Sequence, residues 1–288
     1  MKPSWVHRAL FFGLFGCTAW VGFFGFFRPE EIQRALAWPV PPLHARFIGA
    51  IYLGTSVFCA LAMVSRSLVA VRAVLHIATW WTAWLLMATI LHRDLFDLAN
   101  PRVWFWVFAY VVFPIVGAWL LLRPSRDRVE VPASALITEP WILLVLRIQG
   151  LALVVLALLF FLAPSAAVAI WPWKISPFLA QIYSGPVLGY GLGSLVLARH
   201  RNWPETFLPS LGLFLASGLS IVGSLRHLGL FTSGSPSMIV WFATLGALTL
   251  FAAYLTARAR WPSRRRRRSS SGMPMSMCSG APPLASPR

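Results

Sequence analysis

Two histidines in matching surroundings are the residues of this sequence best placed to do chemistry. His92 and His227 each begin a His-x-x-Leu-Phe stretch that joins two apolar segments. Neutral imidazoles bind metals and haem iron, and they titrate near physiological pH. A facing pair would therefore suit a metal or cofactor site, or a pH-sensitive gate.

A structural role explains the same histidines without a ligand. Each would lie where a membrane helix ends, so that its ring could donate to a backbone carbonyl and, when protonated, complement the helix dipole. Asp94 and Asp97 could add carboxylate ligands beside the first histidine. Gly229 and Thr232 stand at the matching places beside the second. A metal site would therefore be asymmetric, and the structural role is the favoured interpretation.

Tryptophans mark the connections before two of the apolar stretches. Trp38 opens the segment Trp-Pro-Val-Pro-Pro, and Trp171 and Trp173 lie in Trp-Pro-Trp-Lys-Ile-Ser-Pro. Tryptophan favours the headgroup region of a bilayer, and proline suits the first turn of a helix. These segments are predicted to be interfacial anchors, with an aromatic lip that contacts a substrate as the alternative. Trp81 and Trp84 lie deeper and share one helix face, which favours core packing over a ring platform for an apolar ligand.

The sequence lacks the motifs of familiar catalytic sites, such as HExxH, phosphate-binding glycine loops and nucleophile elbows. Its three cysteines, Cys17, Cys59 and Cys278, are not spaced for a disulfide framework or a CxxC metal site. All eight carboxylates fall in expected loops or near the ends of apolar stretches, whereas coupled transporters commonly carry ionisable groups within the membrane. The sequence identifies no reaction and no cofactor, and it disfavours a proton-driven pump.

The composition requires a membrane around most of the chain. Of the 288 residues, 58% are hydrophobic and only 11% are charged, and the mean hydropathy is +0.71. A soluble domain has roughly a quarter of charged residues. Spanning helices are expected because a lipid-facing backbone must satisfy its own hydrogen bonds. Eight are predicted, at residues 9–27, 47–64, 73–91, 103–122, 142–163, 178–198, 207–225 and 238–257.

The basic residues predict the orientation in a cell membrane. Cytoplasmic connections carry an excess of Lys and Arg, and placing both termini in the cytoplasm puts most of the 25 basic residues inside. The bias depends on the tail, because the loops alone differ little. A signal peptide ending near Cys17 is the competing interpretation, and it is disfavoured because the apolar stretch continues to Phe27.

The chain also matches itself when it is displaced so that His92 falls on His227. This displacement aligns residues 42–123 with residues 177–258 without a gap. The identities cluster around the histidines: His92, Leu95, Phe96, Pro101 and Trp106 fall on His227, Leu230, Phe231, Pro236 and Trp241. Trp38-Pro39 is matched to Trp171-Pro172 by a local shift of two residues. Because each copy has an even number of spans, both copies face the same way, and a pseudo-two-fold axis is expected along the membrane normal.

The sequence therefore predicts an all-α, multi-pass membrane protein built from two tandem four-helix repeats. The first repeat covers residues 1–123, a cytoplasmic linker covers 124–140, the second repeat covers 141–260, and a disordered basic cytoplasmic tail covers 261–288. The net charge of +17 is a property of loops and tail, so no nucleic-acid face is expected. Anionic lipid headgroups are the expected partners of five tail residues, Arg264, Arg265, Arg266, Arg267 and Arg268.

Three functions remain open at this stage. The leading hypothesis is a non-catalytic scaffold or sensor subunit that partners another membrane protein and carries its marked loops on the outer face. The first alternative is a small-solute or lipid permease or channel with a pathway between the repeats. The second is a membrane enzyme with a cofactor held by His92 and His227.

Overall fold

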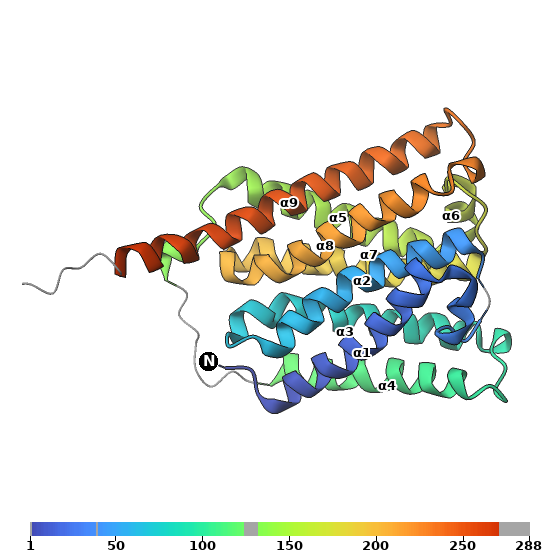
Figure 1. Ribbon diagram of the computed structural model, residues 1–288, viewed down its shortest axis with the longest axis horizontal. Coiled ribbons are helices and arrows are strands. Elements are labelled where there is room, and N and C mark those ends of the chain that lie inside the picture. The colour runs from blue at the N-terminus through green and yellow to red at the C-terminus, as the bar shows by residue number, and fades with distance from the viewer. Residues whose placement is uncertain (1, 39, 124–131, 271–288) are drawn as a thin grey trace, which may run out of the picture.

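The computed structural model describes residues 2–38, 40–123 and 132–270, and this part of the chain is all-α (Figure 1). Its α-helices are α1 (Trp5–Phe27), α2 (Pro42–Val64), α3 (Leu68–Leu91), α4 (Pro101–Leu122), α5 (Pro140–Leu162), α6 (Pro164–Ile170), α7 (Pro177–His200), α8 (Trp203–Leu225) and α9 (Pro236–Ser270). Short 3-10 turns lie in the connections: η1 (Pro29–Arg34), η2 (Arg93–Leu95), η3 (Ala133–Ala135) and η4 (Leu228–Leu230).

Seven of the described helices are long and apolar enough to cross a bilayer, which supports a polytopic membrane protein. They are α1 to α5, α8 and the Pro236–Arg260 part of α9. The sixth expected span coincides with α7, which is 24 residues long but less apolar than the others. The difference follows from its surroundings, because most of α7 is buried against other helices and carries Gly, Ser and Gln where lipid contact would require apolar side chains.

Proline and short polar residues set where the helices begin. Proline occupies the first turn of α2, α4, α5, α7 and α8, where its missing N–H is not needed by the helix. Side-chain caps accept a hydrogen bond from the first turn at four helices: Ser67, Asn100, Ser176 and Asn202. The last helix, α9, continues past its predicted span through residues 264–268 to Ser270. The side chains of residues 261–270 and the whole of 271–288 lie outside the described structure, so the headgroup contacts and the disorder of the tail stay predictions.

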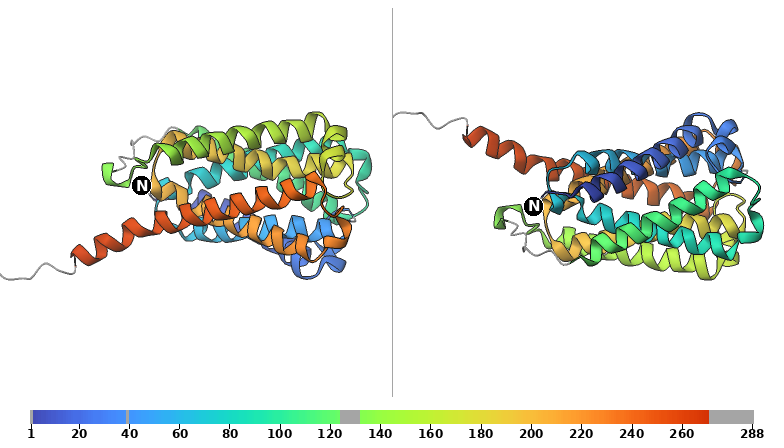
Figure 2. Two further views of the ribbon diagram at one scale, coloured as in Figure 1. Left: turned by 90° about the horizontal axis from the view of Figure 1, so that it is seen from above. Right: turned by 90° about the horizontal axis from the view of Figure 1, so that it is seen from below.

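The helices pack in pairs, and pairs from the first half of the chain contact pairs from the second half (Figure 2). Helix α1 packs on α2 and α3 on α4, while α5 packs on α7 and α8 on α9. The two groups meet where α2 lies against α8 and α3 lies against α7. The first helix begins and the last helix ends at one end of the bundle, and α6 lies at the other (Figure 1).

Glycines bring the two groups of helices into backbone contact. A Cβ atom on Gly54 of α2 would lie 2.4 Å from the carbonyl oxygen of Gly212 in α8. A Cβ atom on Gly189 of α7 would lie 2.9 Å from the carbonyl oxygen of Ile77 in α3. Because neither position has room for a side chain, both cross-contacts are made backbone against backbone.

Candidate functional site

The ring of His92 is held by the other group of helices. Its Nε2 donates to the side-chain oxygen of Gln181 on α7, and the amide nitrogen of Gln181 donates to the carbonyl of Phe161 at 2.8 Å. The ring also packs edge-on against Phe178, with 5.0 Å between centroids. The backbone of His92 caps α3 through its N–H to Ala88. The imidazole thus bridges two helices, where the sequence interpretation had it donating to a carbonyl of its own helix end.

His227 makes a comparable contact in the opposite direction. A guanidinium nitrogen of Arg46 on α2 donates to Nε2 of His227, so this imidazole is neutral in the contact. Burial and then the neighbouring guanidinium groups of Arg46 and Arg226 lower the pKa of His227, and the carboxylate of Glu30 opposes this effect in part. No hydrogen bond or ring contact joins the two histidines to each other in the described part of the chain.

The two aspartates beside His92 lie on the surface. Asp94 pairs with Arg93 at 3.8 Å, and Asp97 accepts the backbone N–H of Ala99 at 2.9 Å. Within the described ranges, no group of three or more His, Cys, Asp and Glu residues is arranged to hold a metal ion. A metal role for the histidines and aspartates therefore gains no support from the geometry.

The marked tryptophans form aromatic clusters at the same end of the bundle. Trp38 packs against Trp106 with 4.5 Å between ring centroids, and Trp173 packs against Trp241 at 4.9 Å. Trp171 contacts the rings of Trp173 and Trp241 and stacks on Tyr183 with 5.4 Å between centroids. The indole N–H groups of Trp38, Trp171 and Trp173 have no acceptor among the described residues. Trp38 and Trp173 are buried, so their rings pack against other side chains of the protein, and their role as interfacial anchors stays a prediction.

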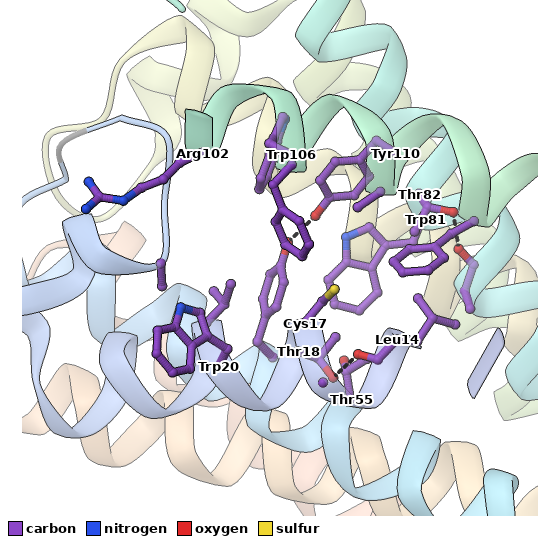
Figure 3. Close-up of a pocket in the computed structure, with 18 of the residues that line it drawn as sticks. Leu14, Cys17, Thr18, Trp20, Thr55, Trp81, Thr82, Arg102, Trp106 and Tyr110 are labelled. Carbon is purple, nitrogen blue, oxygen red and sulfur yellow. Dashed lines mark hydrogen bonds between the residues drawn. The ribbon is translucent and has the colours of Figure 1, made fainter. Parts of the chain in front are cut away.

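A cavity of about 490 Å³ lies among α1, α2, α3 and α4 (Figure 3). Its wall is mostly apolar and includes Leu14, Val21, Trp81 and Phe113. Trp81 is buried in the core, as the favoured interpretation predicted, and it also lines the cavity. The volume lies within the range of about 300–1,000 Å³ that small-molecule sites commonly have.

The cavity is closed at one end and open at the other. A Cβ atom on Gly13 of α1 would lie 3.1 Å from the ring of Phe113 in α4, so these helices meet there. Nearer the C-terminal end of α1, Trp20 is 54% exposed, and nearer the N-terminal end of α4, Phe105 is 61% exposed. Both residues also line the cavity. Because these residues face both the cavity and the outside, the cavity opens between α1 and α4 toward the surrounding lipid.

Two tyrosines provide polar groups in the buried part of the cavity wall. The hydroxyl groups of Tyr52 and Tyr110 hydrogen-bond each other at 2.7 Å, and both side chains are buried. Each phenol has one O–H to donate, and their mutual bond uses only one of the two. The hydroxyls of Thr18 and Thr82 donate to carbonyls of their own helices, each at 2.7 Å. One tyrosine O–H therefore has no acceptor among the hydrogen bonds of the described residues.

Sequence reasoning did not identify Tyr52, Tyr110, Gln181 or Arg46. The last two had a usable signal, because the displacement that places His92 on His227 also places Arg46 on Gln181. The tyrosines had none, since residues 187 and 245 at the matching positions are Val and Leu. No family model matches this chain, and neither the curated proteins nor the solved structures contain a match.

Proposed function

We propose that this protein is a non-catalytic subunit of the cell membrane, a sensor or scaffold, that holds an apolar membrane molecule in the cavity between α1 and α4. The cavity is the observation that carries the proposal. It faces lipid, it has the size of a ligand site, and it is lined by aromatic rings with one available hydroxyl.

The proposal includes two parallel four-helix repeats, supported by contacts that recur at the same displacement. His92 contacts Gln181, and Arg46 contacts His227, which are the same two positions exchanged between the halves. In one half an indole donates to Thr89 at 3.0 Å, and in the other an indole donates to Ser224 at 3.0 Å. The donors, Trp106 and Trp241, are counterparts under the displacement that relates the histidines.

The tryptophan contacts favour a simpler alignment of the repeats. Trp38 contacts Phe96 and Trp106, and Trp173 contacts Phe231 and Trp241, their counterparts. This supports pairing Trp38 with Trp173 without the two-residue shift used for Trp171. Pro39 lies outside the described residues.

The contacts of the glycines and histidines between the two halves favour a binding subunit over the permease and the cofactor enzyme. The halves meet at Gly54 and Gly189 with backbones in contact, which argues against a pathway between them. Both histidines are engaged by side chains of the opposite half, which argues against a cofactor held between their rings.

Native mass spectrometry of the protein in a mild detergent tests the proposal. The expected result is a population carrying one apolar molecule. Gly16 lines the cavity, and its Cβ position is open. The variant Gly16→Phe therefore adds a ring to the cavity wall and should lose this molecule. Gly246→Phe, also at an open position but on α9, is the matched control and should retain it.

Retention in Gly16→Phe equal to that in Gly246→Phe is read together with a second cavity variant. A second variant, Ala109→Phe, narrows the cavity from α4, where Ala109 lines the wall. It covers the case in which the Gly16→Phe ring turns outward to lipid. Retention by both cavity variants, with melting temperatures like that of the control, would place the bound molecule elsewhere on the protein.

A further inference from the structure

The apolar wall of the cavity cannot by itself select a ligand from a bilayer. Lipid tails are as apolar as the side chains of the wall, so transfer of a hydrocarbon chain from lipid into the cavity gains little. Selection has to come from polar groups at defined places. The cavity has two such places, the tyrosine pair at its side and a basic group at its mouth.

Two arginines stand at the mouth of the cavity. Arg102 is the second residue of α4, and Arg34 ends η1 on the opposite side; both line the cavity and both are exposed. Figure 3 shows the Arg102 side chain at the edge of the group of lining residues, above Trp20 in this view. The indole N–H of Trp20 in α1 donates to the carbonyl oxygen of Arg34 at 3.3 Å, and this hydrogen bond connects α1 to η1.

The charges near the mouth do not cancel. Glu31 pairs with Arg28 at 3.0 Å and with Arg34 at 3.1 Å, so one carboxylate is shared by two guanidinium groups. Arg102 has no ion pair with any carboxylate in the described ranges. The mouth therefore has an uncompensated positive charge beside an apolar cavity, at a depth where a lipid headgroup would lie.

We infer that the ligand is a single-chain amphiphile with an anionic head, whose carboxylate or phosphate is bound by Arg102 and Arg34 while its chain fills the cavity. This inference rests on the proposed function and adds the chemical class of the ligand. A guanidinium group binds such oxyanions through paired N–H donors, and this charge-assisted contact is stronger than a neutral hydrogen bond. The cavity volume corresponds to one small ligand and not to a whole two-chain phospholipid.

Photolabelling in nanodiscs of phosphatidylcholine tests the inference. The probes are hexadecanoic acid and hexadecanol carrying the same diazirine on the chain, used at pH 8.5, where the acid is ionised. Labelled peptides from α1 and α4 report occupation of the cavity. The acid should label them roughly tenfold more efficiently than the alcohol, as expected for one charge-assisted hydrogen bond.

The variant Arg102→Gln should lower labelling by the acid to the level of the alcohol and leave the alcohol unchanged. Arg93→Gln is the matched control, because Arg93 is an exposed arginine at the same end that does not line the cavity. It should leave labelling by both probes unchanged.

The outcomes separate this inference from the proposed function. Equal labelling of α1 and α4 by acid and alcohol overturns the anionic head but leaves an apolar ligand. Absence of labelling by either probe overturns the proposed function as well. Loss of labelling when an anionic phospholipid replaces part of the phosphatidylcholine identifies a bilayer lipid as the occupant, which overturns the single-chain ligand. Persistence of labelling in that mixture supports it.

Discussion

His92 of the first four-helix group donates through its imidazole to the side-chain oxygen of Gln181, on a helix of the second group. The reverse contact, from Arg46 to His227, joins the same two groups at the corresponding place. Each histidine thus links the end of one group to a helix of the other, close to the aromatic clusters.

The His92 contact should contribute measurably to stability. A double-mutant cycle with His92→Phe and Gln181→Leu is expected to give a coupling free energy of about 1 kcal/mol, because the phenyl ring keeps the packing and removes only the donor. The measurement is thermal unfolding in detergent, followed by circular dichroism. Strictly additive effects of the two substitutions would show that the bond contributes nothing to stability.

The Arg46–His227 contact should make the protein less stable in acid. The pKa of His227 is lowered below 6.5 in the folded protein, mainly by burial and then by Arg46 and Arg226. The neutral ring is therefore favoured by folding. Its stabilising effect is complete above pH 6.5 and declines as the pH falls from there through the lowered pKa, since a protonated ring cannot accept from Arg46.

Melting temperatures between pH 8 and pH 5 test this prediction. His227→Gln keeps an acceptor for Arg46 but does not titrate, so its melting temperature should fall less over this range than that of the wild type. Parallel pH profiles for the two proteins would contradict the prediction.

Gly54 should be intolerant of larger side chains. In Gly54→Leu the new side chain meets the backbone of Gly212 and cannot be relieved by a rotamer change. We expect a loss of about 1–3 kcal/mol in the free energy of unfolding, as for overpacked cores. Gly246→Leu, at an open position on α9, should stay within about 0.5 kcal/mol of the wild type. Similar stability of both variants would mean that the helices are not in backbone contact.

The tyrosine pair of the cavity should behave as a unit. Tyr52→Phe or Tyr110→Phe alone removes the mutual hydrogen bond and leaves one buried hydroxyl without that partner, at a cost of about 1–3 kcal/mol. The double variant removes both hydroxyls and should cost less than the sum of the single ones. Urea- or heat-induced unfolding of the wild type, the two single variants and the double variant measures their stabilities. A loss of stability in the double variant equal to the sum of the two single losses would rule out the coupling.

The predicted cytoplasmic position of the C-terminus can be tested on the native cysteines. Cys59 is buried and Cys17 lies within α1, so Cys278, which the sequence analysis assigns to the tail, is the thiol expected to react with a membrane-impermeant maleimide. Labelling of Cys278 is expected only after the cells are permeabilised. Labelling of intact cells would invert the orientation deduced from the arginines.

The sequence predicted the helices well because a long apolar stretch in lipid has to satisfy its backbone hydrogen bonds internally, and a helix does this. The prediction was weakest at α7, where burial by protein replaces lipid contact and lowers the apolar content. It placed the histidines at helix ends, where the structure has them, and the repeat implied by displacing His92 onto His227 stays a prediction. It did not show that the imidazoles would contact Gln181 and Arg46, because the displacement only places these two residues on each other.

By itself, the sequence determined a multi-pass helical protein and the order of its helices. Those properties follow from local composition and spacing. Only the tertiary structure decided that the imidazoles meet Gln181 and Arg46, and that a cavity opens between α1 and α4 with Tyr52 against Tyr110. These features depend on how helices distant in the chain are placed side by side, and periodicity within one helix carries no record of that placement.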